Sequence, residues 1–201
     1  MTMTRKEQAG QHSARGGPKA KPPLDEARLR DLALAYVARF ATTGKRVERY
    51  LVRKLRERGW AGEGEPDLDG LIARMGELGY IDDVAFARAR GGDLLRRGYG
   101  ARRVGQVLAE AGVDEPVRRA AAPDEAAARR AAFALARRKR LGPFDSHPPD
   151  PARRAKQLAA IVRAGHGFDA ARAIMDARDE SALAEWVAEA GDDAGNLEGM
   201  D

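Results

Sequence analysis

One helical pattern occurs three times along the chain at a spacing of 53 residues, from Gly59 to Gly112 and again to Gly165. In each copy, basic residues are followed by apolar residues at helical spacing, and the glycine ends the segment. An isolated unit of this size buries only a small core, whereas stacked units bury shared faces. The repeat therefore predicts an all-α protein of three tandem three-helix repeats, which form an elongated, curved, right-angle-stacked, solenoid-like body.

The composition between residues 24 and 179 also favours helices. Ala, Arg, Leu and Glu dominate there, and runs of β-branched residues are missing. We predict five segments, namely a disordered basic N-terminal tail (1–23), helical repeats over 24–79, 80–123 and 124–179, and an acidic C-terminal tail (180–201).

The middle repeat contains the sequence GYIDDVAFARARGGDLLRRGYGARRVGQVLAEAGV, which spans residues 79–113. Its acidic pair fits the start of a helix, with Asp82 as the N-cap and Asp83 in the first turn. The Gly-Tyr-Gly segment (98–100) is not a dinucleotide-binding loop, because no strand precedes it and Arg103 occupies the third glycine position. We therefore interpret this segment as a turn between two helices.

The charge is distributed unevenly along the chain. The formal net charge is +5, but the last 26 residues carry one basic and nine acidic residues, so the first 175 carry +13. A basic body with an acidic end favours a polyanionic partner, with nucleic acid as the first candidate. The alternative interpretation is that the arginines only keep the helices solvated.

The sequence contains no clear arrangement for catalysis or metal binding. Cysteine is absent, which excludes disulfides and thiolate sites. The three histidines lack metal-ligand spacing, and no serine lies in a G-x-S-x-G motif. No apolar run approaches the roughly 18 residues that a membrane span needs. We predict no catalytic, cofactor-binding or metal-binding residues, and a soluble cytoplasmic protein.

The 79–113 stretch resembles the signature region of the RecX regulatory proteins. The resemblance is carried by an aromatic residue, an acidic pair, Phe-Ala, a basic pair, a glycine turn, and a basic helix that ends in Gly-Val. These residues are Tyr80, Asp82, Asp83, Phe86, Ala87, Arg96, Arg97, Gly98, Tyr99, Gly100, Arg103, Val104, Leu108, Gly112 and Val113. The resemblance covers roughly residues 27–176.

The resemblance implies a regulator that binds in the groove of the RecA–DNA filament. It implies inhibition of RecA's ATPase, strand-exchange and coprotease activities, and thereby modulation of recombination and DNA repair. We also predict a monomer that binds single- and double-stranded DNA weakly and without sequence specificity, with no membrane partner. We map the RecA- and DNA-binding surface of the family onto Arg49, Arg53, Arg96, Arg97, Arg102, Arg103, Arg137, Arg138, Lys139, Arg140, Arg153, Arg154 and Lys156.

Two other functions are compatible with the sequence. The segment YGARRVGQVLAEAG (99–112) fits the recognition helix of a sequence-specific helix-turn-helix regulator. A purely structural helical scaffold is the third alternative. Salt-dependent DNA binding without preference for one duplex would separate the filament regulator from both.

Overall fold

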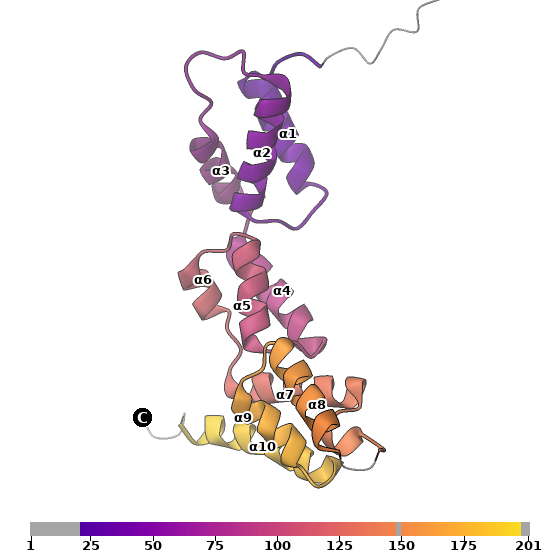
Figure 1. Cartoon of the computed structure of the whole chain (residues 1–201). Helices are drawn as coiled ribbons and strands as arrows, with labels where there is room; N and C mark the ends of the chain where they lie inside the picture. The colour runs from indigo at the N-terminus through magenta and orange to yellow at the C-terminus, as the bar shows by residue number, and fades with distance from the viewer. Residues whose placement is uncertain (1–20, 148–149, 198–201) are drawn as a thin grey trace, which may run out of the picture.

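The computed structural model describes residues 21–147 and 150–197, and this part of the chain is helical (Figure 1). The predicted all-α class is therefore confirmed. The elements are α1 (Glu26–Val37), α2 (Gly44–Arg58), α3 (Leu68–Glu77), α4 (Asp83–Arg96), α5 (Ala101–Glu110), α6 (Glu115–Ala120), α7 (Glu125–Lys139), the 3₁₀ helix η1 (Gly142–Phe144), α8 (Pro151–Arg163), α9 (Phe168–Asp176) and α10 (Glu180–Leu197). The expected basic tail over 1–23 lies almost wholly outside the described residues.

The helices form three successive units along an elongated body (Figure 1). We call α1–α3 unit 1, α4–α6 unit 2 and α7–α9 unit 3. Each unit has its own hydrophobic cluster, in which the second helix contributes a fully or almost fully buried residue: Leu51, Leu108 or Ile161. Contacts between the units are made at helix ends and loops, and also between α4 of unit 2 and α7 of unit 3.

Short polar side chains start most of the helices. A carboxylate or hydroxyl accepts a hydrogen bond from a backbone N–H of the first turn, which would otherwise lack a partner. The predicted cap Asp82 does this for α4, at 2.8 Å from the Ala85 nitrogen. The residues in this role are Asp25, Thr43, Asp67, Asp82, Asp124, Asp150 and Asp179.

The three repeated glycines end the second helix of each unit, as the sequence predicts. Gly59, Gly112 and Gly165 have φ angles of 80°, 82° and 96°, in the left-handed region that an L side chain rarely adopts. Each glycine therefore stops its helix and turns the chain toward the third helix of its unit.

The second helices follow one another end to end. The C-terminal end of α5 meets the N-terminal end of α2, where the Thr43 hydroxyl donates to the Ala111 carbonyl at 2.6 Å. In the same way, the end of α8 meets the start of α5, where the Gly100 N–H donates to the Ala164 carbonyl at 2.9 Å. These contacts pair the negative end of one helix dipole with the positive end of the next.

The segment 180–197 differs from the expected acidic tail, because it forms the helix α10 and packs against α7 (Figure 1). Leu183 is fully buried in the unit 3 cluster, and Trp186 packs against the same cluster. Arg129 of α7 donates to the Trp186 carbonyl at 2.7 Å, and its guanidinium lies 4.9 Å from the centroid of the Trp186 ring. Two apolar residues at helical spacing thus order this segment despite its negative charge.

Candidate nucleic-acid and protein interface

Two of the predicted binding arginines join neighbouring units. Arg49 of α2 donates from Nη2 to the Glu110 carbonyl at 3.1 Å, at the end of α5. Arg102 of α5 donates from Nη2 to the His166 carbonyl at 3.2 Å, just beyond α8. The last carbonyls of a helix have no partner within it, and these guanidinium groups supply one. Arg49 and Arg102 therefore have structural partners at the two junctions.

A second group of predicted arginines pairs with acidic neighbours on the same helix. Arg96 and Arg97 both lie near Asp93, with closest N···O distances of 3.9 and 3.2 Å. Arg53 lies 3.6 Å from Glu57. Such pairs on an exposed helix surface hold their charges loosely, so the cations stay accessible to a stronger anion.

Arg103 has a polar partner on its own helix and joins no ion pair with a described residue. It donates to the Gln106 side chain at 2.9 Å. Within the described part of the chain, its charge is therefore not neutralised by a neighbour.

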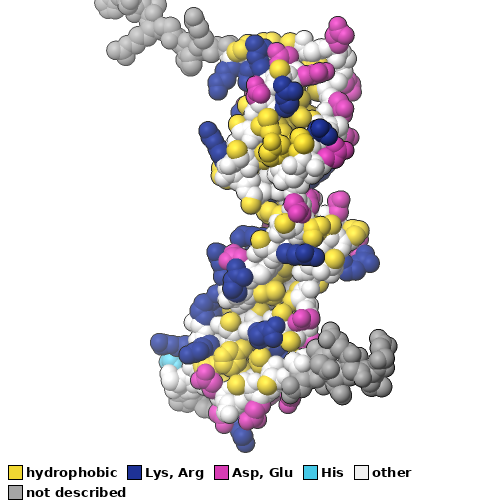
Figure 2. Space-filling model, turned by 180° about the vertical axis from the view of Figure 1, so that it is seen from behind, with side chains coloured by type: hydrophobic (Ala, Val, Ile, Leu, Met, Phe, Trp, Pro, Cys, Tyr) yellow, Lys and Arg dark blue, Asp and Glu magenta, His cyan; other side chains and the backbone are white. Residues whose placement is uncertain are grey.

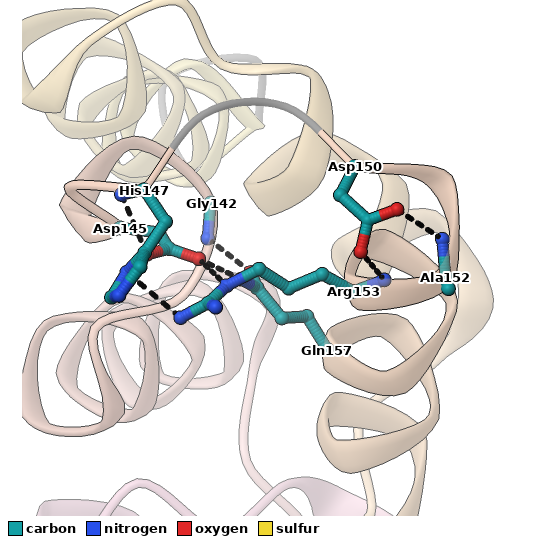
Figure 3. A network of polar contacts seen from close by, with 7 residues as sticks. All are labelled: Gly142, Asp145, His147, Asp150, Ala152, Arg153 and Gln157. Atoms are coloured by element: carbon teal, nitrogen blue, oxygen red, sulfur yellow. Dashed lines mark hydrogen bonds and ion pairs between the residues drawn. The ribbon is translucent and has the colours of Figure 1, made fainter.

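Arg153 belongs to a local network at the start of α8 (Figure 3). Its Nε donates to Asp145 at 2.6 Å, and the His147 imidazole contacts the other oxygen of the same carboxylate at 2.7 Å. Gln157 also donates to Asp145. The hydrogen bond from Arg153 is the main cause of a pKa of Asp145 far below its usual range, followed by those from His147. This network joins Asp145 and His147 to α8, and it engages Arg153, one of the predicted binding residues.

Two further predicted arginines also contact the backbone of unit 2 or unit 3. Arg138 donates to the Arg97 carbonyl, and Arg154 donates to the Met175 carbonyl at 2.6 Å and pairs with Asp176. Each contact uses only part of a guanidinium, which has five N–H donors.

The remaining predicted cations are exposed and lack a side-chain partner among the described residues. They are Arg137, Lys139, Arg140 and Lys156. Three of them lie at the C-terminal end of α7, next to Arg138. This group is the strongest concentration of unpaired positive charge among the predicted residues that the structure describes, and such charge attracts phosphates.

A small hollow lies beside this group, between the ends of α7 and α8. Its volume is about 160 Å³, and its lining includes Tyr99, Arg138, Lys139 and Arg163 but no carboxylate from the described residues. Sequence reasoning missed Arg163, although it occupies the last turn of a helix, two residues before the repeated glycine. Three cations without an acid fit an anionic group in this hollow.

The surface charge is not one continuous stripe. Figure 2 shows Lys and Arg side chains over all three units, gathered along one edge of the middle and lower parts in that view, with acidic groups between them. The predicted residues divide into junction residues, paired residues and the exposed cluster at the end of α7, while Arg103 and Lys156 lie outside these groups and join no ion pair with a described residue.

The sequence is similar to known regulatory proteins, although no family model matches it. The regulatory protein RecX of Myxococcus xanthus is 32% identical over 169 residues, which cover 80% of this chain and 90% of that protein. The chain belongs to the RecX family. Regulatory protein RecX of Neisseria gonorrhoeae is 32% identical over 108 residues, covering 54% of this chain and 66% of that protein.

The fold is shared with a solved RecX structure. The crystal structure of RecX from Lactobacillus salivarius matches with a TM-score of 0.59 and 19% identity, covering 76% of this chain and 95% of that one. The helical architecture described above is therefore that of a RecX protein.

The RecX signature region forms α4, α5 and their flanking turns. Its glycine turn lies where unit 2 meets unit 3: a Cβ atom on Gly100 would lie 2.3 Å from the Gly165 carbonyl carbon. The turn is thus needed for a close approach of two backbones, as well as for the reversal of the chain that the sequence predicts.

The start of the same region borders a groove of about 640 Å³ between units 1 and 2. Tyr80, Phe86 and Arg46 line it, and the Arg46 guanidinium lies 5.3 Å from the centroid of the Phe86 ring. The Thr42 hydroxyl beside it is buried and has no hydrogen-bond partner among the described residues. The surface of the signature region therefore includes a groove that is lined by both apolar and polar side chains.

A half-buried carboxyl group and a buried imidazole lie at the two junctions between units. Asp83 accepts a hydrogen bond from the Gly44 N–H at 3.0 Å, and burial raises the pKa of its carboxyl. The Nε2 atom of His166 lies 3.1 Å from the Gly98 carbonyl, and burial lowers the pKa of this imidazole. Each of these side chains contacts the backbone of the neighbouring unit.

The described ranges contain neither a metal cluster nor a membrane span. No group of three or more His, Asp and Glu residues within 21–147 and 150–197 could hold a metal ion. No helix in that part of the chain is both long enough and apolar enough to cross a bilayer.

Proposed function

We propose that this protein binds the RecA–DNA filament and inhibits RecA's ATPase, strand-exchange and coprotease activities without catalysing a reaction itself. The observation that carries the proposal is membership of the RecX family over most of the chain. The exposed cations at the end of α7 support it, because the filament carries the phosphates of its DNA.

The mechanism follows from differential binding. A ligand shifts an equilibrium only through its different affinity for the two states. Three units in a row can contact several neighbouring sites along a filament. Because each unit has its own core, the junctions between units set the distance between those contacts. Inhibition then follows when the spacing of the three bound units fits a filament state that neither hydrolyses ATP nor grows.

The test is RecA's DNA-dependent ATP hydrolysis on single-stranded DNA, with this protein added in substoichiometric amounts. We expect inhibition at well below one molecule per RecA, and a variant with Arg137, Lys139 and Arg140 changed to Gln should inhibit less. Arg74→Gln, at an exposed residue of α3 outside the predicted surface, is the matched control. Undiminished hydrolysis at equimolar protein would overturn the proposal.

The helix-turn-helix alternative is less well supported. A recognition helix reads bases with residues near its N-terminal end. In α5 that end packs against the end of α8, and the Arg102 guanidinium bonds to the Val162 and His166 carbonyls. Equal affinity for unrelated duplexes at moderate salt is therefore expected.

A further inference from the structure

Unit 1 gathers three aromatic side chains in a protein in which aromatic residues make up only 5% of the chain. Tyr36 of α1 and Tyr50 of α2 are stacked, with ring centroids 4.5 Å apart and an interplanar angle of 23°. Phe40, just beyond α1, lies 5.7 Å from Tyr36 and is 58% exposed. The packing of α1 on α2 thus creates an aromatic row that the sequence alone does not reveal.

Arginines surround this row. A hollow of about 340 Å³ is lined by Tyr36, Tyr50, Arg46, Arg49 and Arg53, together with one acid, Glu110. We call it the tyrosine hollow. The Arg53 guanidinium lies 5.6 Å from the centroid of the Tyr50 ring.

Lys54 lies on the same ring, with its ammonium 5.8 Å from the centroid of the Tyr50 ring, and it pairs with Glu57 at 2.5 Å. The guanidinium groups of the lining outnumber its single carboxylate. The tyrosine hollow therefore combines flat apolar faces with an excess of positive charge.

We propose that the tyrosine hollow is a stacking site for an unpaired base of single-stranded nucleic acid. Aromatic rings stack on the flat face of any base, and neighbouring arginines hold the flanking phosphates. A base within a duplex has both faces covered and cannot use such a site. The proposal rests on the proposed function, which brings this protein to filament DNA, and assigns unit 1 a contact distinct from the cations of α7.

The chemistry favours a nucleic acid over an acidic peptide. A carboxylate needs only the guanidinium groups, and it leaves the row formed by Tyr36, Tyr50 and Phe40 unused. A nucleotide uses both features at once, because it has a planar base beside a phosphate. Binding at this site therefore depends on the bases as well as on the charge of the strand.

The experiment measures binding of the full chain to labelled oligothymidylate and to an abasic oligonucleotide of the same length, without RecA. We expect the wild-type protein to bind the abasic strand about tenfold more weakly. Equal affinity of the wild-type protein for the two strands would overturn the proposal, irrespective of how the variants bind. Polyglutamate then serves as a competitor at the same concentration of charges as the DNA. Loss of the preference for bases in its presence would also overturn the proposal.

Variants then test whether the Tyr50 ring causes the preference for the strand with bases. Tyr50→Leu keeps an apolar side chain but removes the ring, and we expect it to bind both strands equally. Tyr50→Phe keeps the ring and the preference. Phe168→Leu is the matched control, because Phe168 is 57% exposed with the Arg172 guanidinium 5.9 Å from its ring centroid, yet lies in unit 3.

The outcomes separate this proposal from the proposed function. The Tyr50→Leu protein must first show an unchanged circular dichroism spectrum. If it still prefers the strand with bases, stacking occurs elsewhere, and this proposal alone is overturned. Loss of RecA inhibition is read separately in the ATP hydrolysis assay. A wild-type protein that prefers bases but leaves RecA unaffected would overturn the proposed function and keep the stacking site.

Discussion

Arg49 and Arg102 make the same kind of contact at successive junctions: each guanidinium donates to a backbone carbonyl at the end of the next unit's second helix. They lie 53 residues apart, the spacing of the repeated glycines. The repeat in the sequence is therefore also a repeat of the connections between units.

Loss of a junction arginine should destabilise the fold. We expect Arg102→Ala to lower the free energy of unfolding by about 1–2 kcal/mol, because two carbonyls lose a charged donor. Urea unfolding followed by circular dichroism measures this change. Arg137→Ala, at an exposed residue without a side-chain partner among the described ones, should change it by less than about 0.5 kcal/mol. Equal effects of the two substitutions would contradict the structural role of Arg102.

A methyl group at the glycine turn should separate units 2 and 3. In Gly100→Ala the new Cβ would lie 2.3 Å from the Gly165 backbone, which cannot move aside without shifting α8. We expect destabilisation by about 3 kcal/mol, as for other overpacked sites. Gly105→Ala is the control, because a Cβ atom there would have no described neighbour within 4 Å and Ala favours helix. The prediction is that the two melting temperatures move in opposite directions.

Stability should fall in mildly acidic solution because of His166. Burial lowers the pKa of this imidazole below its ordinary value of 6.5, so the folded protein binds its proton less readily than the unfolded chain. Its contribution is complete above pH 6.5 and decreases as the pH falls toward the folded-state pKa. Urea unfolding between about pH 7.5 and 5.5 should show a steeper loss for the wild-type protein than for His166→Asn. Parallel curves would show that His166 does not cause the loss.

The cations at the end of α7 should control the salt dependence of DNA binding. Changing Arg137 and Lys139 to Gln removes two candidate phosphate contacts, and the slope of log K against log salt should become shallower by about 1 to 2. Titrations of single-stranded DNA at several salt concentrations give this slope. Arg74→Gln should leave it unchanged, and a slope unaltered in the double variant would remove this cluster from the interface.

Much of the architecture follows from local patterns. Apolar residues at helical spacing define the second helices, Asp82 caps α4, and Gly112 ends α5 with a positive φ. Each of these features depends on residues within one or two turns of a helix, so a single sequence is enough to predict them. The resemblance of the 79–113 stretch then identified the family.

The candidate site was less accessible to sequence reasoning. Arginines such as Arg49 and Arg137 look alike in the sequence, yet one holds a junction and the other is exposed without a partner among the described residues. The aromatic row of Tyr36, Phe40 and Tyr50 was missed because Tyr50 meets Tyr36 only when α2 packs against α1. The helix α10 was missed because its negative charge outweighed, in the sequence, the two apolar residues that anchor it.

By itself, the sequence determined where helices start, where they end and which faces they bury, because neighbouring residues set those properties. Only the tertiary structure decided which helix ends meet and which charged side chains form the contacts between them. The contact of Gly100 with Gly165 and the bond from Arg49 to Glu110 join residues more than 60 positions apart. No local spacing encodes such contacts, since they depend on the simultaneous fit of two folded units.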